Sequence, residues 1–427
     1  MSINAYLKTR AVSGPWRIEG CTEGGYAGAV VIPALAESPH LFATLSSLAA
    51  NPPEYCRNLL VLVVVNQRED ATPADRDDNQ VTLEQLRSGK GSASHLKLAW
   101  VDASSPGLEL PAKGGGVGLA RKIGLDLALT RLDHGDSHAF LTCLDADTLV
   151  QPDYLAALRA HFATNSCGGA VIPFVHQRSD SPAIARAIVR YELFLRSYVL
   201  GLSLAGSPYA FHTVGSAMAC RADAYLRMGG MNSRSAGEDF YFLQQLARTS
   251  GIAQVRGTTV FPSPRASHRV PFGTGRSIAR QMGGDSDTVL FYRSDCFRIL
   301  SGWLKLVKEN GETAGEQLLM GAEKISADLA DYLESIRCAE TWDKLRRNHP
   351  RPAALQKAFD DWFDGLRTMK LIHHLSAGPL PRCQPEETVP DLLAWSGLPA
   401  ATDQLAQLEL LRTLQLDCDY PKQASEN

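Results

Sequence analysis

Two apolar runs near the amino terminus decide the fold: "AGAVVIPAL" at residues 27–35 and "NLLVLVVVN" at residues 58–66. Neither run alternates with polar residues, which is typical of strands that are buried on both faces of a parallel sheet. The segment between them, "SPHLFATLSSLAANP", has helical spacing and stops at Asn51-Pro52. This stretch therefore predicts a βαβ unit with two parallel strands.

The same alternation continues along the first half of the chain. Further strands are expected at "LKLAWVDAS", "HAFLTCLDAD" and "GGAVIPFVH", which are residues 96–104, 138–147 and 168–176. A glycine loop that runs into a helix is expected at 113–132, whereas residues 67–95 are polar and predict a loop with one short exposed helix around "TLEQLRSG". The pattern indicates an α/β fold with a mostly parallel central sheet and flanking helices, followed by a C-terminal helical segment.

Composition narrows the function classes. The chain has 427 residues, of which 44% are hydrophobic, and a net charge of −3, so it lacks the general basic surface that nucleic acid requires. Its nine cysteines are odd in number and form no C-x-x-C pair, which argues against a disulfide framework or a zinc site. We expect no nucleic-acid partner and a reducing, cytoplasmic environment.

No stretch predicts a signal peptide or a membrane-spanning helix. The segment from Ile184, "IARAIVRYELFLRSYVLGLSLAG", combines a broad apolar face with Arg186, Arg190 and Arg196. It favours a helix with one side buried in a core. Peripheral contact with the inner face of a membrane is the alternative.

Two carboxylates follow an apolar run in "LTCLDADTLVQPDY", residues 141–154. Residues i and i+2 of a strand share a side, so Asp145 and Asp147 are expected to project together at the strand end. Their charges would raise each other's pKa unless a cation pairs with them, and hard oxygens suit Mn²⁺ or Mg²⁺ bridging phosphates. In the alternative, Asp147 caps the helix after Pro152 or starts a turn, and Asp145 pairs with a lysine or arginine.

Several motifs occur in a fixed order, and together they are more specific than any one of them. They are "VVIPALAES", "VLVVVNQRED", "GVGLARKIG", "FLTCLDADTLVQPDYL" and "TVGSAMACRADAYLRMGGMNSRSAGEDFYFLQQLA". In order and spacing this set resembles the inverting family 2 glycosyltransferases, which have the GT-A fold, over roughly residues 27–275. The resemblance implies a nucleotide-diphospho-sugar transferase-like domain at 27–290, after an extension at 1–26 and before a helical segment at 300–420.

The resemblance also implies roles for individual residues beside the nucleotide. Pro33 and Glu37 match the motif of the first strand, and Asn66 stands where such enzymes often have an aspartate that contacts the base. This departure leaves the identity of the base open. Asp145 would hold the ribose or the metal, and Asp147 would hold the metal.

The "GED" motif would make Asp239 the general base, with Glu238 beside it. Inverting transfer needs a carboxylate to remove the proton of the acceptor hydroxyl while a metal neutralises the departing diphosphate. The alternative is that Glu238 and Asp239 simply begin a helix, where acidic residues favour the positive end of its dipole. Both interpretations can hold together.

Two basic segments are candidates for phosphate contact. The glycine stretch "KGGGVGLARKIG" fits neither dinucleotide nor P-loop spacing, but its helix start can face the nucleotide with Arg121; a flexible hinge is the alternative. The loop "SPRASHRVPFGTGR", residues 263–276, contains Arg265, His268, Arg269 and Arg276. It resembles the loop that closes over the diphosphate, with His268 as third metal ligand; a solvated basic loop is the alternative.

The expected function is transfer of a sugar from a nucleoside-diphosphate sugar to an acceptor hydroxyl with inversion and with Mn²⁺ or Mg²⁺. The alternatives are a GT-A-like nucleotidyltransferase, whose usual basic glycine-rich signature "VVIPALAES" lacks, and a non-catalytic protein that binds a sugar nucleotide or glycan. The acceptor is left open between a glycan, a lipid-linked molecule and a small molecule. The C-terminal helices are expected to pack as a cap or to mediate homo-oligomer formation.

Overall fold

The structure is a computed structural model that describes residues 2–91, 95–267, 273–283 and 289–417. The chain divides into two compact units. The first comprises the chain up to Ile184, Thr213–Ala279 and the described residues from Leu416. The second comprises Ala185–His212 and Arg280–Gln415. Each unit thus contains segments that are far apart in the sequence.

The first unit is built on an eight-stranded sheet. Its strands are, in spatial order, β1 (Ile18–Gly20), β4 (Lys97–Ala103), β3 (Leu59–Asn66), β2 (Gly28–Ala34), β5 (Phe140–Cys143), β8 (Met218–Arg221), β7 (Gly169–Val171) and β9 (Ile252–Gln254). The pairs β4–β3, β3–β2, β2–β5 and β7–β9 are parallel, whereas β1–β4, β5–β8 and β8–β7 are antiparallel. The sheet is therefore mostly parallel.

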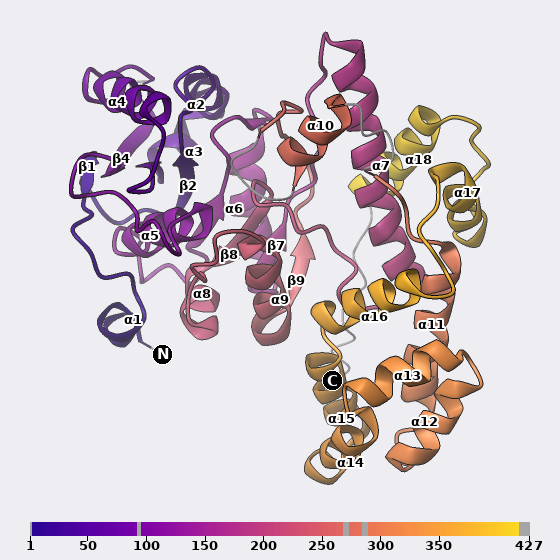
Figure 1. The fold of residues 1–427 in the computed structure, drawn as a ribbon. Coiled ribbons are helices and arrows are strands. Elements are labelled where there is room, and N and C mark those ends of the chain that lie inside the picture. Colours follow the sequence, from indigo (N-terminus) through magenta and orange to yellow (C-terminus); the bar gives the residue numbers. More distant parts are fainter. Residues whose placement is uncertain (1, 92–94, 268–272, 284–288, 418–427) are drawn as a thin grey trace. The chain divides into compact units, whose positions relative to one another are not determined.

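Helices flank this sheet, as Figure 1 shows. The helices of this unit are α1 (Ile3–Thr9), α2 (Leu41–Ala49), α3 (Pro53–Arg57), α4 (Pro73–Arg87), α5 (Val117–Leu129), α6 (Tyr154–Thr164), α8 (Ala222–Met228), α9 (Glu238–Ser250) and the first part of α10 (Thr274–Met282), which continues past Ala279. Helix α5 packs on β2 and β3. A Cβ atom on its Gly124 would lie 2.3 Å from Cγ1 of Val31, so glycine permits this close approach.

The central strands confirm the prediction that the two apolar runs are strands buried on both faces. Every residue of β2 and β3 is buried, as expected for parallel strands that are covered on both faces. The predicted fold class is confirmed: an α/β chain with a mostly parallel sheet, flanking helices and a helical segment toward the carboxyl terminus.

Three predicted elements differ clearly in extent. The short exposed helix expected within residues 67–95 is the 15-residue α4. Its inner face includes the buried polar residues Asn79 and Thr82, which a search for apolar periodicity does not recognise. The strand expected at 138–147 ends at Cys143, and the one expected at 168–176 ends at Val171.

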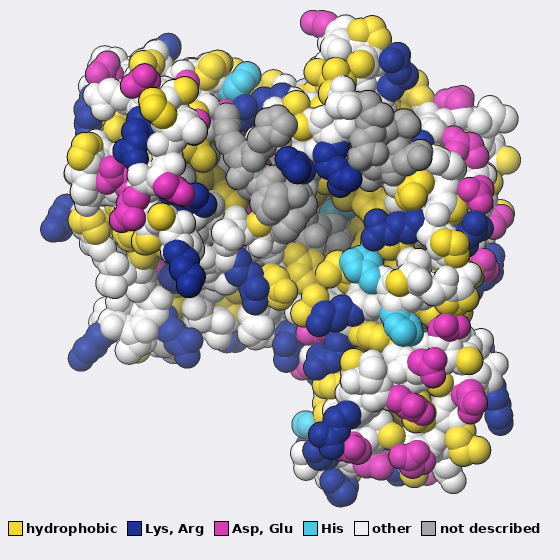
Figure 2. All heavy atoms as spheres, viewed as in Figure 1, with side chains coloured by type: hydrophobic (Ala, Val, Ile, Leu, Met, Phe, Trp, Pro, Cys, Tyr) yellow, Lys and Arg dark blue, Asp and Glu magenta, His cyan; other side chains and the backbone are white. Residues whose placement is uncertain are grey.

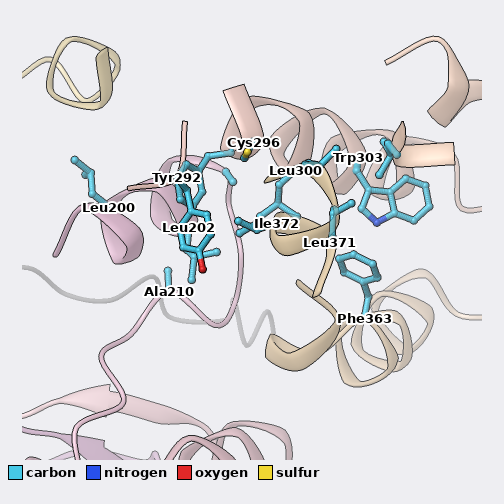
Figure 3. Close-up of a cluster of buried hydrophobic side chains, with 14 of the residues drawn as sticks. Leu200, Leu202, Ala210, Tyr292, Cys296, Leu300, Trp303, Phe363, Leu371 and Ile372 are labelled. Carbon is cyan, nitrogen blue, oxygen red and sulfur yellow. The ribbon is translucent and has the colours of Figure 1, made fainter. Parts of the chain in front are cut away.

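The second unit is helical. It contains most of α7 (Pro182–Leu204), together with α11 (Ser294–Glu309), α12 (Gly315–Glu323), α13 (Ala327–Ser335), α14 (Cys338–Asn348), α15 (Pro352–Trp362), α16 (Gly365–Ala377), α17 (Pro385–Trp395) and α18 (Gln404–Asp417). Figure 3 shows part of its core, where Trp303 and Phe363 face one another with ring centroids 6.0 Å apart. The long helix α7 contributes Leu193 and Leu200 to this core.

Charges of both signs are interspersed on the face drawn in Figure 2. Among the described residues, no helix combines the length and the apolar composition that crossing a membrane requires. In α7, Arg186 is exposed, whereas Arg196 is only 1% exposed and pairs with Glu192. The buried Arg196 is therefore part of the protein core, as the core interpretation of this helix requires.

Candidate active site

Asp145 and Asp147 follow the carboxyl end of β5 in a turn. The prediction that they share one side of a strand is wrong, because the strand stops at Cys143. Instead they have different partners: Asp145 pairs with Arg121, and Asp147 pairs with Arg265. The alternative in which Asp145 pairs with a basic residue is thus confirmed. Nevertheless, both carboxylates lie at the edge of the sheet where ligand sites of parallel folds are found.

Arg265 reaches Asp147 through a second, two-stranded sheet. Strand β6 (Leu149–Val150) pairs with β10 (Val260–Phe261) in antiparallel register, with Phe261 opposite Leu149. The chain after Phe261 therefore runs back along the chain before Leu149. As a result, Nε of Arg265 donates to Oδ2 of Asp147 at 2.6 Å, and its Nη2 donates to Glu37.

Arg121 connects two acidic segments of the site. It lies on α5, is 3% exposed, and donates through Nη2 to Asp145 and through Nη1 to Glu238. Burial lowers the pKa of Arg121, but the two carboxylates more than offset this and raise it above its usual value. The expected contact of Arg121 with the nucleotide is still a proposal, since both ends of its guanidinium bind protein carboxylates.

Glu238 and Asp239 begin helix α9, as the alternative interpretation requires. Their environments differ. Glu238 is 3% exposed and bound to Arg121, whereas none of the described ion pairs involves Asp239. Burial, followed by the negative charge of Glu238, raises the pKa of Asp239 to about 6. A carboxylate with this pKa can accept a proton near neutral pH.

The end of β2 supplies Glu37. This residue is 6% exposed and follows Ala36, whose φ of 51° lies in the left-handed region. Such backbone strain in a residue other than glycine is concentrated at functional sites. Side-chain Oδ1 of Asn79 accepts a hydrogen bond from the Ala36 backbone N–H at 2.9 Å, which holds this turn in place.

The other two residues expected beside the nucleotide are buried in or at the sheet. Pro33 lies within β2, next to Val64 of β3. Asn66 is 4% exposed, and its Nδ2 donates to the carbonyl oxygens of Ala34 and Val64 at 3.1 and 3.0 Å. The Asn66 amide therefore joins the ends of β2 and β3. Contact of Asn66 with a base is still a prediction.

The basic loop is only partly described. His268 and Arg269 lie outside the described residues. Arg276 is exposed on α10, and no described ion pair joins it to the acidic residues. The residue of this loop that does reach the site is Arg265. The sequence signals a basic loop, but it does not distinguish Arg265 from the other arginines.

The donor chemistry of the site fits a hard divalent cation. Asp145 and Asp147 offer carboxylate oxygens, and Mg²⁺ is commonly held by one or two carboxylates together with substrate phosphates. Among the described residues, no three His, Cys, Asp or Glu side chains come together to form a complete metal site. The two aspartates are thus compatible with a metal that is shared with a phosphate ligand.

The sequence match agrees with this geometry. Residues 140–282 match the model of the family described as glycosyl transferase family group 2. This segment is similar to the family 2 glycosyltransferases. The predicted resemblance and the predicted enzyme class are thereby confirmed. The matched segment contains both aspartates after β5, the Glu238–Asp239 pair and Arg265.

Solved structures resemble this chain only remotely. Residues 1–349 of S. aureus TarS in complex with UDP-GlcNAc are 13% identical with a TM-score of 0.39, and the match covers 75% of this chain and 91% of that one. The mannosyltransferase PcManGT from Pyrobaculum calidifontis, in complex with GDP-Man and Mn²⁺, is 15% identical with a TM-score of 0.35 and coverages of 85% and 93%. No curated protein matches the chain.

Proposed function

We propose that this glycosyltransferase moves a sugar from a nucleoside-diphosphate sugar to an acceptor hydroxyl with inversion, and that a divalent metal assists it. The observation that carries the proposal is the position of Arg121. This guanidinium joins Asp145, in the metal-binding half of the site, to Glu238, which precedes the candidate base Asp239. One buried cation thus links the two functions that inverting transfer needs.

The charge of the site supports a metal requirement. The carboxylates of Glu37, Asp145, Asp147, Glu238 and Asp239 outnumber the two guanidinium groups that bind them, which leaves a net charge of −3 when all are ionised. A diphosphate carries negative charge of its own and would be repelled. A divalent cation on Asp147 would reduce this net charge to −1 and would offset the negative charge of the leaving group.

The protein groups supply the remaining chemistry. In the proposed step, Asp239 removes the proton of the acceptor hydroxyl, whose oxygen attacks the anomeric carbon. A new C–O bond forms as the bond between sugar and diphosphate breaks, and the nucleoside diphosphate leaves. Glu238 is unsuited to the role of base because its carboxylate is bound to Arg121. We assign it to positioning.

The direct test is to incubate the protein with a panel of UDP-, GDP- and dTDP-sugars. The release of nucleoside diphosphate is measured with and without Mn²⁺ or Mg²⁺. Ligand-induced shifts in the melting temperature would first identify the base that binds. The anomeric configuration of the product, determined by NMR, tests inversion. The proposal is contradicted if the protein turns over none of these donors. It is also contradicted if the reaction occurs at the α-phosphate of the nucleotide, as in a nucleotidyltransferase.

Asp147→Asn is predicted to weaken both metal binding and metal-dependent nucleotide binding. The substitution removes one hard charged ligand, and we expect a loss of affinity for Mn²⁺ of about tenfold or more. Isothermal titration calorimetry measures both affinities. The matched control is Asp153→Asn, an exposed aspartate six positions further on. Nucleotide binding that is insensitive both to EDTA and to Asp147→Asn would rule out this ligand.

A further inference from the structure

The two arginines of the site are held to very different degrees. Arg121 lies on a helix and is almost fully buried, and a Cβ atom on Gly215 would lie 2.5 Å from its Nη2. Arg265 lies after β10, among the described residues 262–267, which form neither helix nor strand, and its side chain is 26% exposed. Arg121 is therefore a fixed counter-ion, whereas Arg265 has room to move.

Arg265 binds the carboxylate of Asp147, which a metal would also need. Its Nε donates to Oδ2 of Asp147 at 2.6 Å, while its Nη2 donates to Glu37. The side chain of Asp147 is 19% exposed and therefore accessible to an ion from solvent. A guanidinium and a divalent cation both need the same carboxylate lone pairs, and their charges repel one another. They cannot both bind this oxygen.

We propose that Arg265 is an exchangeable counter-ion: a divalent metal displaces it from Asp147, and the released guanidinium then binds the diphosphate of the donor. This inference rests on the proposed function. Guanidinium groups bind phosphate oxygens through paired, charge-assisted hydrogen bonds, so the freed group has a favourable second partner. Metal and nucleotide therefore strengthen one another's binding through Arg265.

The exchange accounts for an otherwise costly arrangement. Glu37 follows β2 and Asp147 follows β5, and Arg265 contacts both side chains. Without a cation between them, two negative charges would be held in a partly dehydrated environment, which is costly. Arg265 neutralises both carboxylates until the metal arrives. The pair thus holds the Asp147 side chain in place, and it prevents a diphosphate from occupying Arg265 before the metal is bound.

Arg265→Gln in the full chain tests the exchange by calorimetry with two probes. With Mn²⁺ alone, we expect about tenfold tighter binding than in the wild type, because the competing cation is gone. With UDP and GDP at saturating Mn²⁺, we expect about tenfold weaker binding, because a diphosphate ligand is lost. Changes of opposite sign are a signature that a general structural defect would not produce.

Two controls accompany this test. Arg159→Gln breaks a comparable pair, in which Nη1 donates to Oδ2 of Asp136 at 2.6 Å with a side chain 34% exposed, and it should change neither affinity. Arg265→Lys retains the charge but not the forked geometry, so it should bind Mn²⁺ about as weakly as the wild type. If Arg265→Lys instead resembles Arg265→Gln, the charge competition is refuted.

The outcomes separate this inference from the proposed function. Equal Mn²⁺ affinity of the wild type and Arg265→Gln, at a site that Asp147→Asn abolishes, overturns the exchange and leaves the metal site intact. Mn²⁺ affinity that does not depend on Asp147 in either background overturns both proposals. Tighter Mn²⁺ binding with unchanged UDP and GDP affinity overturns the transfer of Arg265 to the diphosphate.

Discussion

Asp239→Asn should reduce the rate of sugar transfer by about 10²-fold or more while leaving donor binding nearly intact. The reason is that Asp239 is the acidic residue of the site whose pKa, about 6, matches a general base and for which no described ion pair competes. The amide keeps the size of the side chain but cannot accept the proton. Steady-state kinetics with calorimetric donor affinities separate the two effects.

The pH dependence follows from the same pKa. Burial and the charge of Glu238 raise the pKa of Asp239 to about 6, so kcat/KM of the wild type should fall as the pH drops below about 6. The residual activity of Asp239→Asn should lack this acidic limb, because the variant has no carboxylate there to protonate. The control is Asp223→Asn at an exposed aspartate. This variant should retain both the transfer rate and the fall of kcat/KM at acidic pH.

Stability should change in the opposite direction from activity. A carboxyl whose pKa is raised on folding is more protonated in the folded than in the unfolded chain, so stability falls as the pH rises from about 4 to 6. Asp239→Asn removes this penalty and should stabilise the protein at pH 8 by about 1 to 3 kcal/mol. A near-wild-type transfer rate in this variant would refute the assignment of the base.

The sequence predicts the centre of the sheet well because burial leaves a clear pattern there. Strands β2 and β3 are nearly continuous apolar runs in which every residue is buried. The sequence pattern underestimates the length of helix α4, because the polar residue Asn79 faces inward and forms hydrogen bonds there. Its Nδ2 donates to the Asn66 carbonyl oxygen at 3.1 Å and to Gln67 Oε1 at 2.9 Å. A helix with such a polar inner face has a sequence pattern like that of a loop.

The candidate site was predicted as a set of residues but not as a set of contacts. The motif order indicates that Asp145, Asp147, Glu238 and Asp239 belong together. The ion pair between Arg121 and Glu238, however, joins positions 117 residues apart, and no local spacing specifies it. The register of β6 and β10, which are two residues each, places Arg265 beside Asp147. Strands this short have no readable periodicity.

The helical unit illustrates the same limit. In the sequence, Arg196 is one of three arginines that the segment from Ile184 combines with a broad apolar face. In the structure it is 1% exposed, and its Nε donates to Oε1 of Glu192 at 2.8 Å. Its Nη1 donates to Oε1 of Gln415 at 3.2 Å, and Arg412 donates to Glu192; both residues belong to α18, about 220 residues further along the chain. A buried charge can be recognised as structural only once its partners are known.

Glu192→Gln is predicted to destabilise the second unit by about 3 to 5 kcal/mol. Glu192 is 0% exposed and accepts hydrogen bonds at 2.8 Å from Nε of Arg196 and from Nε and Nη2 of Arg412. The amide retains the volume of the side chain but not its charge. Arg196 would then be buried without its carboxylate partner, and its repulsion with the guanidinium of Arg412 would favour separation of α18 from α7.

The matched control uses the other acidic partner of Arg412. Glu409 is also within α18, and its Oε1 accepts from Nη1 of Arg412 at 2.7 Å, but its side chain is 57% exposed. Glu409→Gln should therefore cost less than about 1 kcal/mol. Urea unfolding followed by tryptophan fluorescence reports mainly on the second unit, which contains Trp303, Trp342, Trp362 and Trp395. Equal destabilisation by the two substitutions would show that α18 is not held to α7 by the buried charge of Glu192.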